Sequence, residues 1–354
     1  MSELSDLIAD TSERIFHDLG DPQSVINSGD GGWRPPLWSA IEEAGLSRAM
    51  VPEALGGVGI PLAVAFDILR IAGRHAVALP LAETVLAGWL LGRGGISAPD
   101  GMIAVAPTQR HSRLSIDDRG RITGRCDAVP FAGEVSHFAV LAQNGDAGCH
   151  VALLSADEVA VDAGHSIAGD DLGTVICEAT EPLAAAKVDG LTQDSLMQFG
   201  AVARAMQMAG ALEALLDMSV QYAQERVAFG RPISKYQAVQ HNLARMAGEV
   251  AAAVAIATSA AYALEQGSEL DEAVLIEAAS AKIRVGEAAG EGAAIAHQVH
   301  GAIGYTMEHP LHRFAQRLWA WRDDFGGEVE WAERLGRVYA SKGGLGMWPT
   351  VTAA

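Results

Sequence analysis

The sequence predicts an α+β protein in which an N-terminal helical domain, a small antiparallel β domain and a C-terminal four-helix bundle follow one another. Three observations predict this order. Residues 1–100 carry apolar residues at helical spacing, residues 101–190 break into short β-rich runs, and residues 191–345 return to long segments rich in Ala, Leu and Met. We expect the domain boundaries at those positions.

The composition excludes several classes of protein. The 354 residues are 49% hydrophobic and 19% charged, so the chain can bury a sizeable core. A formal charge of -19 disfavours nucleic acid or an anionic membrane surface as the main partner, because both require basic patches. We expect no membrane insertion, since no apolar run reaches the length needed to cross a bilayer, and no secretory signal. Three unevenly spaced cysteines form no disulfide framework, which favours a cytoplasmic location.

The N-terminal region is predicted to form helices interrupted by one loop. A helix is expected over 35–51 after a proline in the first turn, and residues 62–92 are expected to form one or two buried helices. The intervening "PEALGGVGIP" (52–61) predicts a Pro/Gly turn. It is not a dinucleotide-binding fingerprint, because no strand precedes it.

The middle region is predicted to form a small barrel or sandwich. Its short runs, such as "MIAVAP" and "HFAVLAQ", are bounded by Gly, Asp and Asn. An Asn-Gly pair at 144–145 predicts a hairpin.

Four long segments joined by short turns predict the antiparallel helical bundle. The helices are expected over 194–226, 236–267 and 270–301, and from Pro310 toward Tyr339. The pairs His297/His300 and His309/His312 are each three residues apart but lack a third ligand, so we expect no metal site.

A basic cluster lies where the first two of these helices meet. The stretch "YAQERVAFGRPISKYQAVQHNLARM" (222–246) places Arg226, Arg231 and Lys235 near a helix N-terminus. In an acidic chain, such a cluster is suited to a phosphate group. An ordinary helical hairpin whose basic groups face water explains the same residues.

A second stretch, "HQVHGAIGYTMEHPLHRF" (297–314), predicts a helix that runs into a glycine-containing turn. The small residues Gly301, Ala302 and Gly304 would let a ligand approach the backbone, and Gln298 could hydrogen-bond its polar edge. In isolation, a helix that ends at a glycine explains this stretch equally.

Together, and in this order, the two stretches resemble the signature regions of the acyl-CoA dehydrogenase flavoproteins. The loop "VPEALGGVGIP" and the order of helices, β region and helical bundle also resemble that family, over nearly the whole chain. Ala302 replaces the second glycine of the family pattern, which is tolerated where φ is negative. The residues that carry the resemblance are Arg226, Phe229, Gly230, Ile233, Gln237, Gln298, Gly301, Ala302, Gly304, Tyr305 and Pro310.

The resemblance implies an acyl-CoA dehydrogenase-like fold that binds FAD across subunit interfaces. It implies that Arg226 and Phe229 reach the FAD of a neighbouring subunit, with Arg226 at the pyrophosphate, and that Gln237 lines the same site. It further implies that Gln298 serves a different copy of FAD, so that the protein is a homo- or hetero-oligomer, a dimer of dimers. The implied partners are an acyl-CoA substrate and an electron-transferring flavoprotein. The loop implied to hold the ADP end contains Gln298, Gly301, Ala302 and Gly304.

The reaction of that family is the α,β-dehydrogenation of an acyl-CoA thioester, in which a carboxylate removes the α-proton. Such a base must be close, desolvated and raised in pKa. The resemblance places the base at Phe325 or Gly326, or in a second arrangement near Gly200, and none of these is a carboxylate. The stretch "AVAPTQRHSR" also lacks the family's Thr-Glu-Pro-x-x-Gly-Ser-Asp loop.

An acid-rich stretch, "RDDFGGEVEW" (322–331), adjoins the first of these positions. We interpret it mainly as a turn, with Asp324 and Glu328 as candidate displaced bases. Three hypotheses follow. The chain is a subunit of a heteromeric α2β2 enzyme of the steroid side-chain type whose partner supplies the base, a homomeric enzyme with a displaced base, or a non-catalytic helical scaffold of the same fold.

Overall fold

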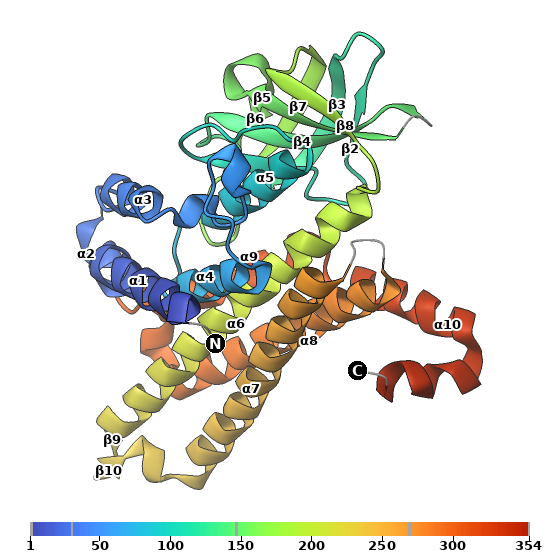
Figure 1. Ribbon diagram of the computed structural model, residues 1–354. Coiled ribbons are helices and arrows are strands. Elements are labelled where there is room, and N and C mark those ends of the chain that lie inside the picture. The colour runs from blue at the N-terminus through green and yellow to red at the C-terminus, as the bar shows by residue number, and fades with distance from the viewer. Residues whose placement is uncertain (1–2, 30, 146–147, 268–270, 353–354) are drawn as a thin grey trace.

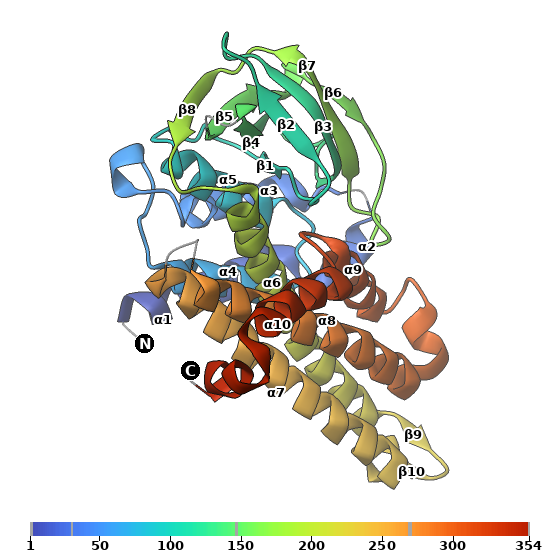
Figure 2. The same ribbon diagram turned by 90° about the vertical axis from the view of Figure 1, so that its right-hand side faces the viewer.

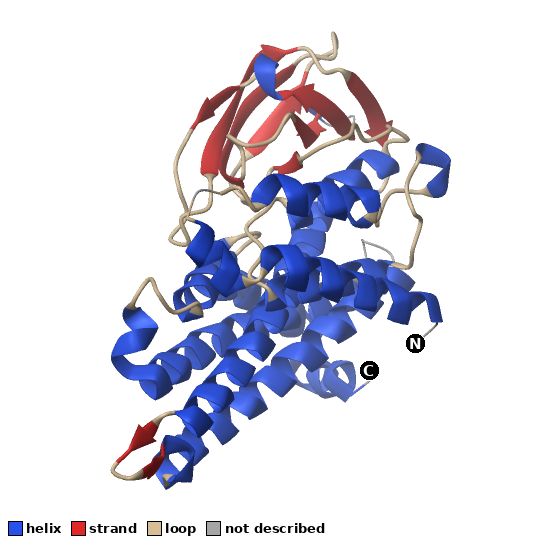
Figure 3. Cartoon of the chain, turned by 90° about the vertical axis from the view of Figure 1, so that its left-hand side faces the viewer, coloured by secondary structure: helices blue, strands red, loops and turns tan. Residues whose placement is uncertain are grey.

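The computed structural model describes residues 3–29, 31–145, 148–267 and 271–352. Figure 1 shows a β-sheet at one end of the molecule, with long helices that run away from it toward the opposite end. The division into three domains stays a prediction, but helices, strands and helices follow one another in the predicted order. Figure 3 shows most strands gathered at one end of the molecule and the helices below them.

The N-terminal helices lie along one side of the long helix α6 (Gln193–Glu225). The predicted helical segment 62–92 forms two helices, because the chain turns at 75–80. The second of them is buried almost all round, since it packs between the sheet and α6. The bounds are α1 (Glu3–Gly20), α2 (Pro22–Ser28), α3 (Arg34–Glu43), α4 (Leu62–Arg74) and α5 (Leu81–Arg93), with 3-10 turns η1 (Leu46–Arg48) and η2 (Glu53–Leu55).

The middle of the chain forms one mainly antiparallel sheet with strand order β6-β7-β3-β2-β4-β5-β8, and β1 pairs with β4. The hairpin predicted at Asn144–Gly145 is confirmed, because β4 and β5 pair in antiparallel register on either side of it. In addition, β4 pairs in parallel with β1 and, at one position, with β2. The bounds are β1 (Ile103–Ala106), β2 (Arg113–Ile116), β3 (Ile122–Pro130), β4 (His137–Gln143), β5 (Cys149–Ser155), β6 (Ala160–Asp162), β7 (Leu172–Thr180) and β8 (Ala184–Val188).

The C-terminal half begins with α6, whose first turn is fixed by a capping box. The Thr192 hydroxyl accepts from the Ser195 N–H at 3.1 Å, and the Ser195 hydroxyl accepts from the Thr192 N–H at 3.2 Å. The bundle helices pack side by side (Figure 2). The bounds are β9 (Val227–Ala228), β10 (Arg231–Pro232), η5 (Ile233–Lys235), α7 (Gln237–Gln266), α8 (Glu272–His300), η6 (Gly301–Tyr305), α9 (Leu311–Asp323) and α10 (Glu328–Thr352).

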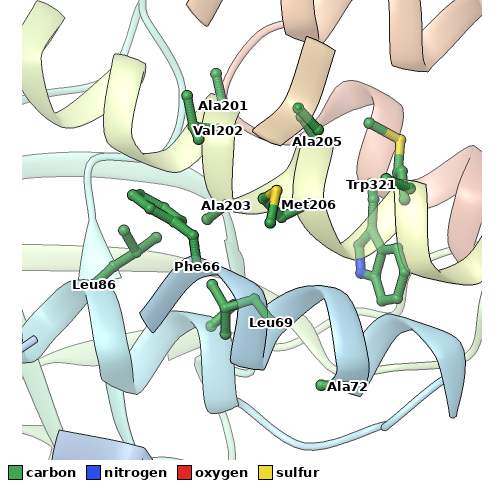
Figure 4. Packing of buried hydrophobic residues seen from close by; sticks show 14 of the residues in the cluster. Phe66, Leu69, Ala72, Leu86, Ala201, Val202, Ala203, Ala205, Met206 and Trp321 are labelled. Carbon is green, nitrogen blue, oxygen red and sulfur yellow. The ribbon is translucent and has the colours of Figure 1, made fainter. Parts of the chain in front are cut away.

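Helices α4 and α6 approach each other at backbone distance. A Cβ atom added at Gly210 would overlap the Arg70 carbonyl, and one added at Gly73 would overlap the Gln207 carbonyl. Apolar side chains of both helices, among them Phe66, pack here with Leu86 of α5 and Trp321 of the segment 311–323 (Figure 4). The two glycines therefore set how closely the N-terminal helices pack on the bundle.

The helix predicted from Pro310 toward Tyr339 is interrupted, so that prediction is corrected. The chain leaves α9 after Asp323 and enters α10 at Glu328. Between them, Phe325 (φ 55°) and Gly326 (φ 91°) adopt the left-handed conformation, which ends a helix. The interpretation of this stretch as a turn is confirmed, and we call residues 324–327 the α9–α10 turn.

By length and composition only, helix α7 is apolar enough to cross a bilayer, contrary to our interpretation of the apolar runs. The expectation of no membrane insertion stays a prediction. Helix α7 packs lengthwise on α6 and α8. Only a third of its apolar window is buried, and exposed positions such as Ala244, Ala251 and Ala255 follow one another along one side. The helix thus combines a bundle-facing side with an open side of small residues.

Candidate functional site

The first predicted motif lies on a projecting hairpin between α6 and α7. Arg226 caps α6, and the two short strands β9 and β10 pair so that Phe229, which is 97% exposed, lies in the turn between them. Arg231 lies over the Tyr236 ring, 4.2 Å from its centroid. Among the described residues, no acidic side chain pairs with Arg226, Arg231 or Lys235. In a chain with a net charge of -19, these cations are free for an anionic ligand.

The two predicted motifs meet in one groove. A depression of about 300 Å³ lies beside the hairpin, and we call it the hairpin groove. Phe229 and Gln298 both line it, so the geometry argues against the expectation that the two motifs serve different FAD copies. Gln237 is exposed and does not line it. The lining residues are Ala228, Phe229, Ile233, Tyr236, Ala238, Val239, Asn242, Gln298 and Val299.

The loop after α8 has the open backbone that the sequence predicts. Gly301 has a φ of 63°, and a Cβ atom there would meet no described atom within 4 Å. Ala302 lies outside the left-handed region, so its replacement of a glycine introduces no strain. Gly304 is buried against His300 and His297. A Cβ atom at this position would lie 3.2 Å from the His300 Cβ, so any larger residue would crowd the loop against α8.

Aromatic stacking at the end of α8 supports the loop that follows it. The His297 ring stacks on Tyr305 at 4.5 Å and on Trp319 at 5.9 Å between ring centroids. His300 stacks on Tyr222 at 4.5 Å. Burial lowers the pKa of His297, and lowers that of His300 to about 4, so both rings are neutral near pH 7.

A second recess, of about 630 Å³, lies between the sheet and α9, and we call it the α9 cavity. The sheet and the segment 165–172 contribute one wall, and α9 with Asp324 of the α9–α10 turn contributes the other. Gln109 reaches it from the stretch that replaces the family loop. The lining residues are Gln109, Ala128, Pro130, Phe131, His165, Ser166, Ile167, Asp170, Asp171, Leu172, Arg204 and Trp319 to Asp324.

The two positions predicted for a base contact each other beside this cavity. A Cβ atom at Gly200 on α6 would overlap the ring of Phe325 in the α9–α10 turn. Phe325 is 1% exposed, so its ring fills the space completely. Position 325 is therefore occupied by a phenyl ring, and position 200 must lack a side chain so that this ring fits.

Comparison with known proteins agrees with this arrangement of elements. The family described as acyl-CoA dehydrogenase, C-terminal domain, matches residues 190–321. Acyl-CoA dehydrogenase IpdE2 of Mycobacterium tuberculosis is 28% identical over 289 residues, which are 81% of this chain and 81% of that protein. Acyl-CoA dehydrogenase FadE27 of the same organism is 29% identical over 332 residues, covering 86% and 88%. The chain is thus similar to acyl-CoA dehydrogenases over most of its length.

A solved structure shows the same fold over nearly the whole of this chain. A chain in the crystal structure of the ChsE4-ChsE5 complex from Mycobacterium tuberculosis superimposes with a TM-score of 0.85 at 25% identity. The match covers 96% of this chain and 98% of that chain. The predicted fold class and the predicted family are thereby confirmed.

The candidate base Asp324 is engaged in a buried ion network. The Arg204 Nε–H donates to Asp324 Oδ2 at 2.8 Å, and the same guanidinium pairs with Glu83. Arg204 and Glu83 are both 2% exposed at the side chain. Burial raises the pKa of Glu83 despite the neighbouring guanidinium. Arg204 thus balances two acids, Glu83 and Asp324.

The candidate base Glu328 is also paired. The Arg322 Nε–H donates to its carboxylate at 2.5 Å. A carboxylate held by a guanidinium is a weaker base than a desolvated, unpaired one. Among the described residues, no group of three or more His, Cys, Asp or Glu side chains is arranged to hold a metal ion.

Sequence reasoning missed Glu83 and Arg204. They are isolated charges in otherwise apolar helices, and that is the one signal the sequence offers for them. Their pairing joins residues 121 positions apart, which periodicity cannot reveal.

Proposed function

We propose that this chain is a subunit of an FAD-dependent acyl-CoA dehydrogenase, and that an unlike partner chain supplies the base for α,β-dehydrogenation of an acyl-CoA thioester. The observation that carries the proposal is the contact between Gly200 and Phe325. A base must reach the substrate α-carbon with an unpaired carboxylate. Both positions predicted for it lack a carboxylate, and the two candidate displaced bases, Asp324 and Glu328, are paired with arginines.

The hairpin groove and its surroundings fit the ADP end of FAD. Arg226 would hold the diphosphate, since no described acid competes for it, and a guanidinium matches phosphate geometry. Phe229 and Gln298 would contact the adenosine, and the exposed backbone of Gly301 leaves room for close approach. When bound, FAD supplies the acceptor for the hydride that leaves the β-carbon.

The α9 cavity would hold the reacting end of the thioester. Trp319 and Trp321 would orient the acyl chain and exclude water, while Gln109 offers an amide from the opposite wall. The chain's own part in the reaction is then to bind and position, and the proton is removed by a carboxylate of the partner.

We propose that the partner packs on the open side of α7, in a hetero-oligomeric dimer of dimers. The exposed small residues of that helix would allow close packing of a second helix. The ChsE4-ChsE5 relative is itself a complex of two named chains, which supports an unlike partner. An electron-transferring flavoprotein is the proposed oxidant, and the free cysteines agree with a cytoplasmic location.

Co-expression tests the proposal. The chain is purified alone and together with a co-expressed acyl-CoA dehydrogenase-like neighbour, and the visible spectrum, the native mass and the anaerobic bleaching by acyl-CoA are recorded. We expect flavin absorption near roughly 450 nm and turnover only in the two-chain sample. Turnover by the chain alone would contradict the need for a partner, and two chains without bound flavin would support the scaffold hypothesis.

A homomeric enzyme with a displaced base is the second candidate, because Asp324 does line the α9 cavity. Asp324→Asn and Glu328→Gln separate the two cases. If one of them is the base, its variant loses turnover by roughly 10²-fold or more while flavin stays bound. Under our proposal, Asp324→Asn mainly destabilises the fold, by about 3 kcal/mol, since it leaves Arg204 with one buried partner fewer. Glu328→Gln retains turnover in the two-chain sample.

A further inference from the structure

The α9–α10 turn is fastened by a buried lysine from another helix. Lys282 of α8 is 1% exposed. Its Nζ donates to the carbonyl of Arg322 at 2.6 Å and to the carbonyl of Gly326 at 2.6 Å. One ammonium group thus joins the last turn of α9 to the far end of the α9–α10 turn.

Two further side chains hold the residues between these carbonyls. The Trp331 Nε1–H of α10 donates to the Phe325 carbonyl at 2.9 Å, and Arg204 of α6 holds the Asp324 carboxylate. Phe325 itself is in the left-handed conformation, with φ at 55°. A non-glycine residue keeps such a backbone only where its surroundings hold it there.

We propose that Lys282 is a positioning residue for the reaction site: by tying the end of α9 to the α9–α10 turn, it holds Asp324 in place in the wall of the α9 cavity. The inference rests on the proposed function for its link to ligand binding. Lys282 does not line the cavity, so it acts through the turn and not by contact with a ligand.

The chemistry of the site explains why a lysine stands here. Burying an ammonium group is unfavourable unless it is paired, and a methionine of similar length would fill the same space without that penalty. The ammonium satisfies two backbone carbonyls that would otherwise be unpaired, and it faces the acids Asp323, Asp324 and Glu328 as well as the cation Arg204. Burial lowers the pKa of Lys282 to about 8. The two hydrogen bonds from the Lys282 ammonium therefore weaken as the pH rises through about 8.

Lys282→Met tests the proposal, with Lys187→Met as the matched control. Lys187 is an exposed lysine on β8, so its variant makes the same change in net charge away from the turn. Hydrogen exchange of a peptide covering 322–331 reports the turn directly, without any ligand. We expect exchange about tenfold faster in Lys282→Met and unchanged in Lys187→Met.

Ligand binding supplies the readout that a general loss of stability would not give. Butyryl-CoA, a small acyl-CoA thioester, is titrated at pH 7 and pH 9 into the protein as purified, with its partner chain where that is required. We expect wild-type affinity to weaken from pH 7 to pH 9, and Lys282→Met to bind about tenfold more weakly at pH 7 with no further change at pH 9. Wild-type exchange in the turn together with wild-type affinity in Lys282→Met would overturn the proposal.

Trp331→Phe keeps the test decisive if Lys282→Met does not fold. It removes the second donor to the same turn while keeping an aromatic ring. Faster hydrogen exchange of Trp331→Phe that is confined to 322–331 supports a turn held by side chains. Unchanged exchange in that peptide overturns the proposal. If wild-type protein binds no FAD, the proposed function fails, while hydrogen exchange still decides whether Lys282 holds the turn.

Discussion

Gly200 and Phe325 share one volume, and the size of the side chain at one position limits the other. Gly200→Ala should lower the free energy of unfolding by about 1–3 kcal/mol, because its methyl group overlaps the phenyl ring in a packed interior. Phe325→Ala should cost more, about 3–5 kcal/mol, since it empties a buried site. Urea denaturation of each variant measures both.

The double variant shows whether the two effects have one cause. If the Gly200 methyl clashes only with the Phe325 ring, removing the ring relieves the clash. The double variant should then be more stable than the sum of the single losses predicts, by at least about 0.5 kcal/mol. Strict additivity would mean that Gly200 is required for another reason.

His300 makes the stability of the fold depend on pH. Its pKa is about 4 in the folded protein, against an ordinary value of 6.5, because it is buried. Between these values the unfolded chain binds a proton that the folded chain does not, so the free energy of unfolding falls as pH drops from 6.5 toward 4. We expect this loss to be about 2 kcal/mol for His300. His300→Phe keeps a ring against Tyr222 and should flatten the slope. Urea denaturation at pH 7 and pH 4.5 measures the free energy of unfolding of both proteins. An equal loss between the two pH values in wild type and His300→Phe would refute the attribution to His300.

At the scale of elements, the crossing of α4 and α6 depends on two glycines. Gly210→Ala should destabilise the protein by about 2–3 kcal/mol, because its methyl group would push the Arg70 carbonyl away and separate the helices. Gly336→Ala is the matched control, since Gly336 lies in α10 with no described atom within 4 Å of an added Cβ. That control should gain up to about 1 kcal/mol from helix propensity. Thermal and urea unfolding measure the stability of both variants. A similar loss of stability in Gly210→Ala and Gly336→Ala would contradict the close crossing of α4 and α6.

The break between α9 and α10 shows where local reasoning about elements stops. The Gly-Gly pair predicts a turn, but the apolar spacing on both sides also suits one long helix. What decides is the left-handed Phe325, whose conformation depends on Gly200, Lys282 and Trp331. None of these is a near neighbour on the α9 side, so the sequence around the turn contains only part of the information that shapes it.

For the whole molecule, the order of helices and strands could be predicted because helical and strand periodicities are local. The motif residues Phe229 and Gln298 were also identifiable, although their meeting in one groove was not, since it depends on how α7 and α8 pack. The network of Glu83, Arg204 and Asp324 was out of reach for the same reason. Long-range ion pairing leaves no periodic trace.

The contact between Gly200 and Phe325 also constrains how this chain can change over generations. A carboxylate introduced at 200 finds no room while the phenyl ring remains. A carboxylate introduced at 325 would lie near the Arg204 guanidinium, whose carbon is 5.9 Å from the present ring centroid, and that charge would weaken it as a base. No single substitution at either position restores an unpaired acid. On the proposed function, the packing of Gly200 against Phe325 therefore disfavours a base of the chain's own at either position.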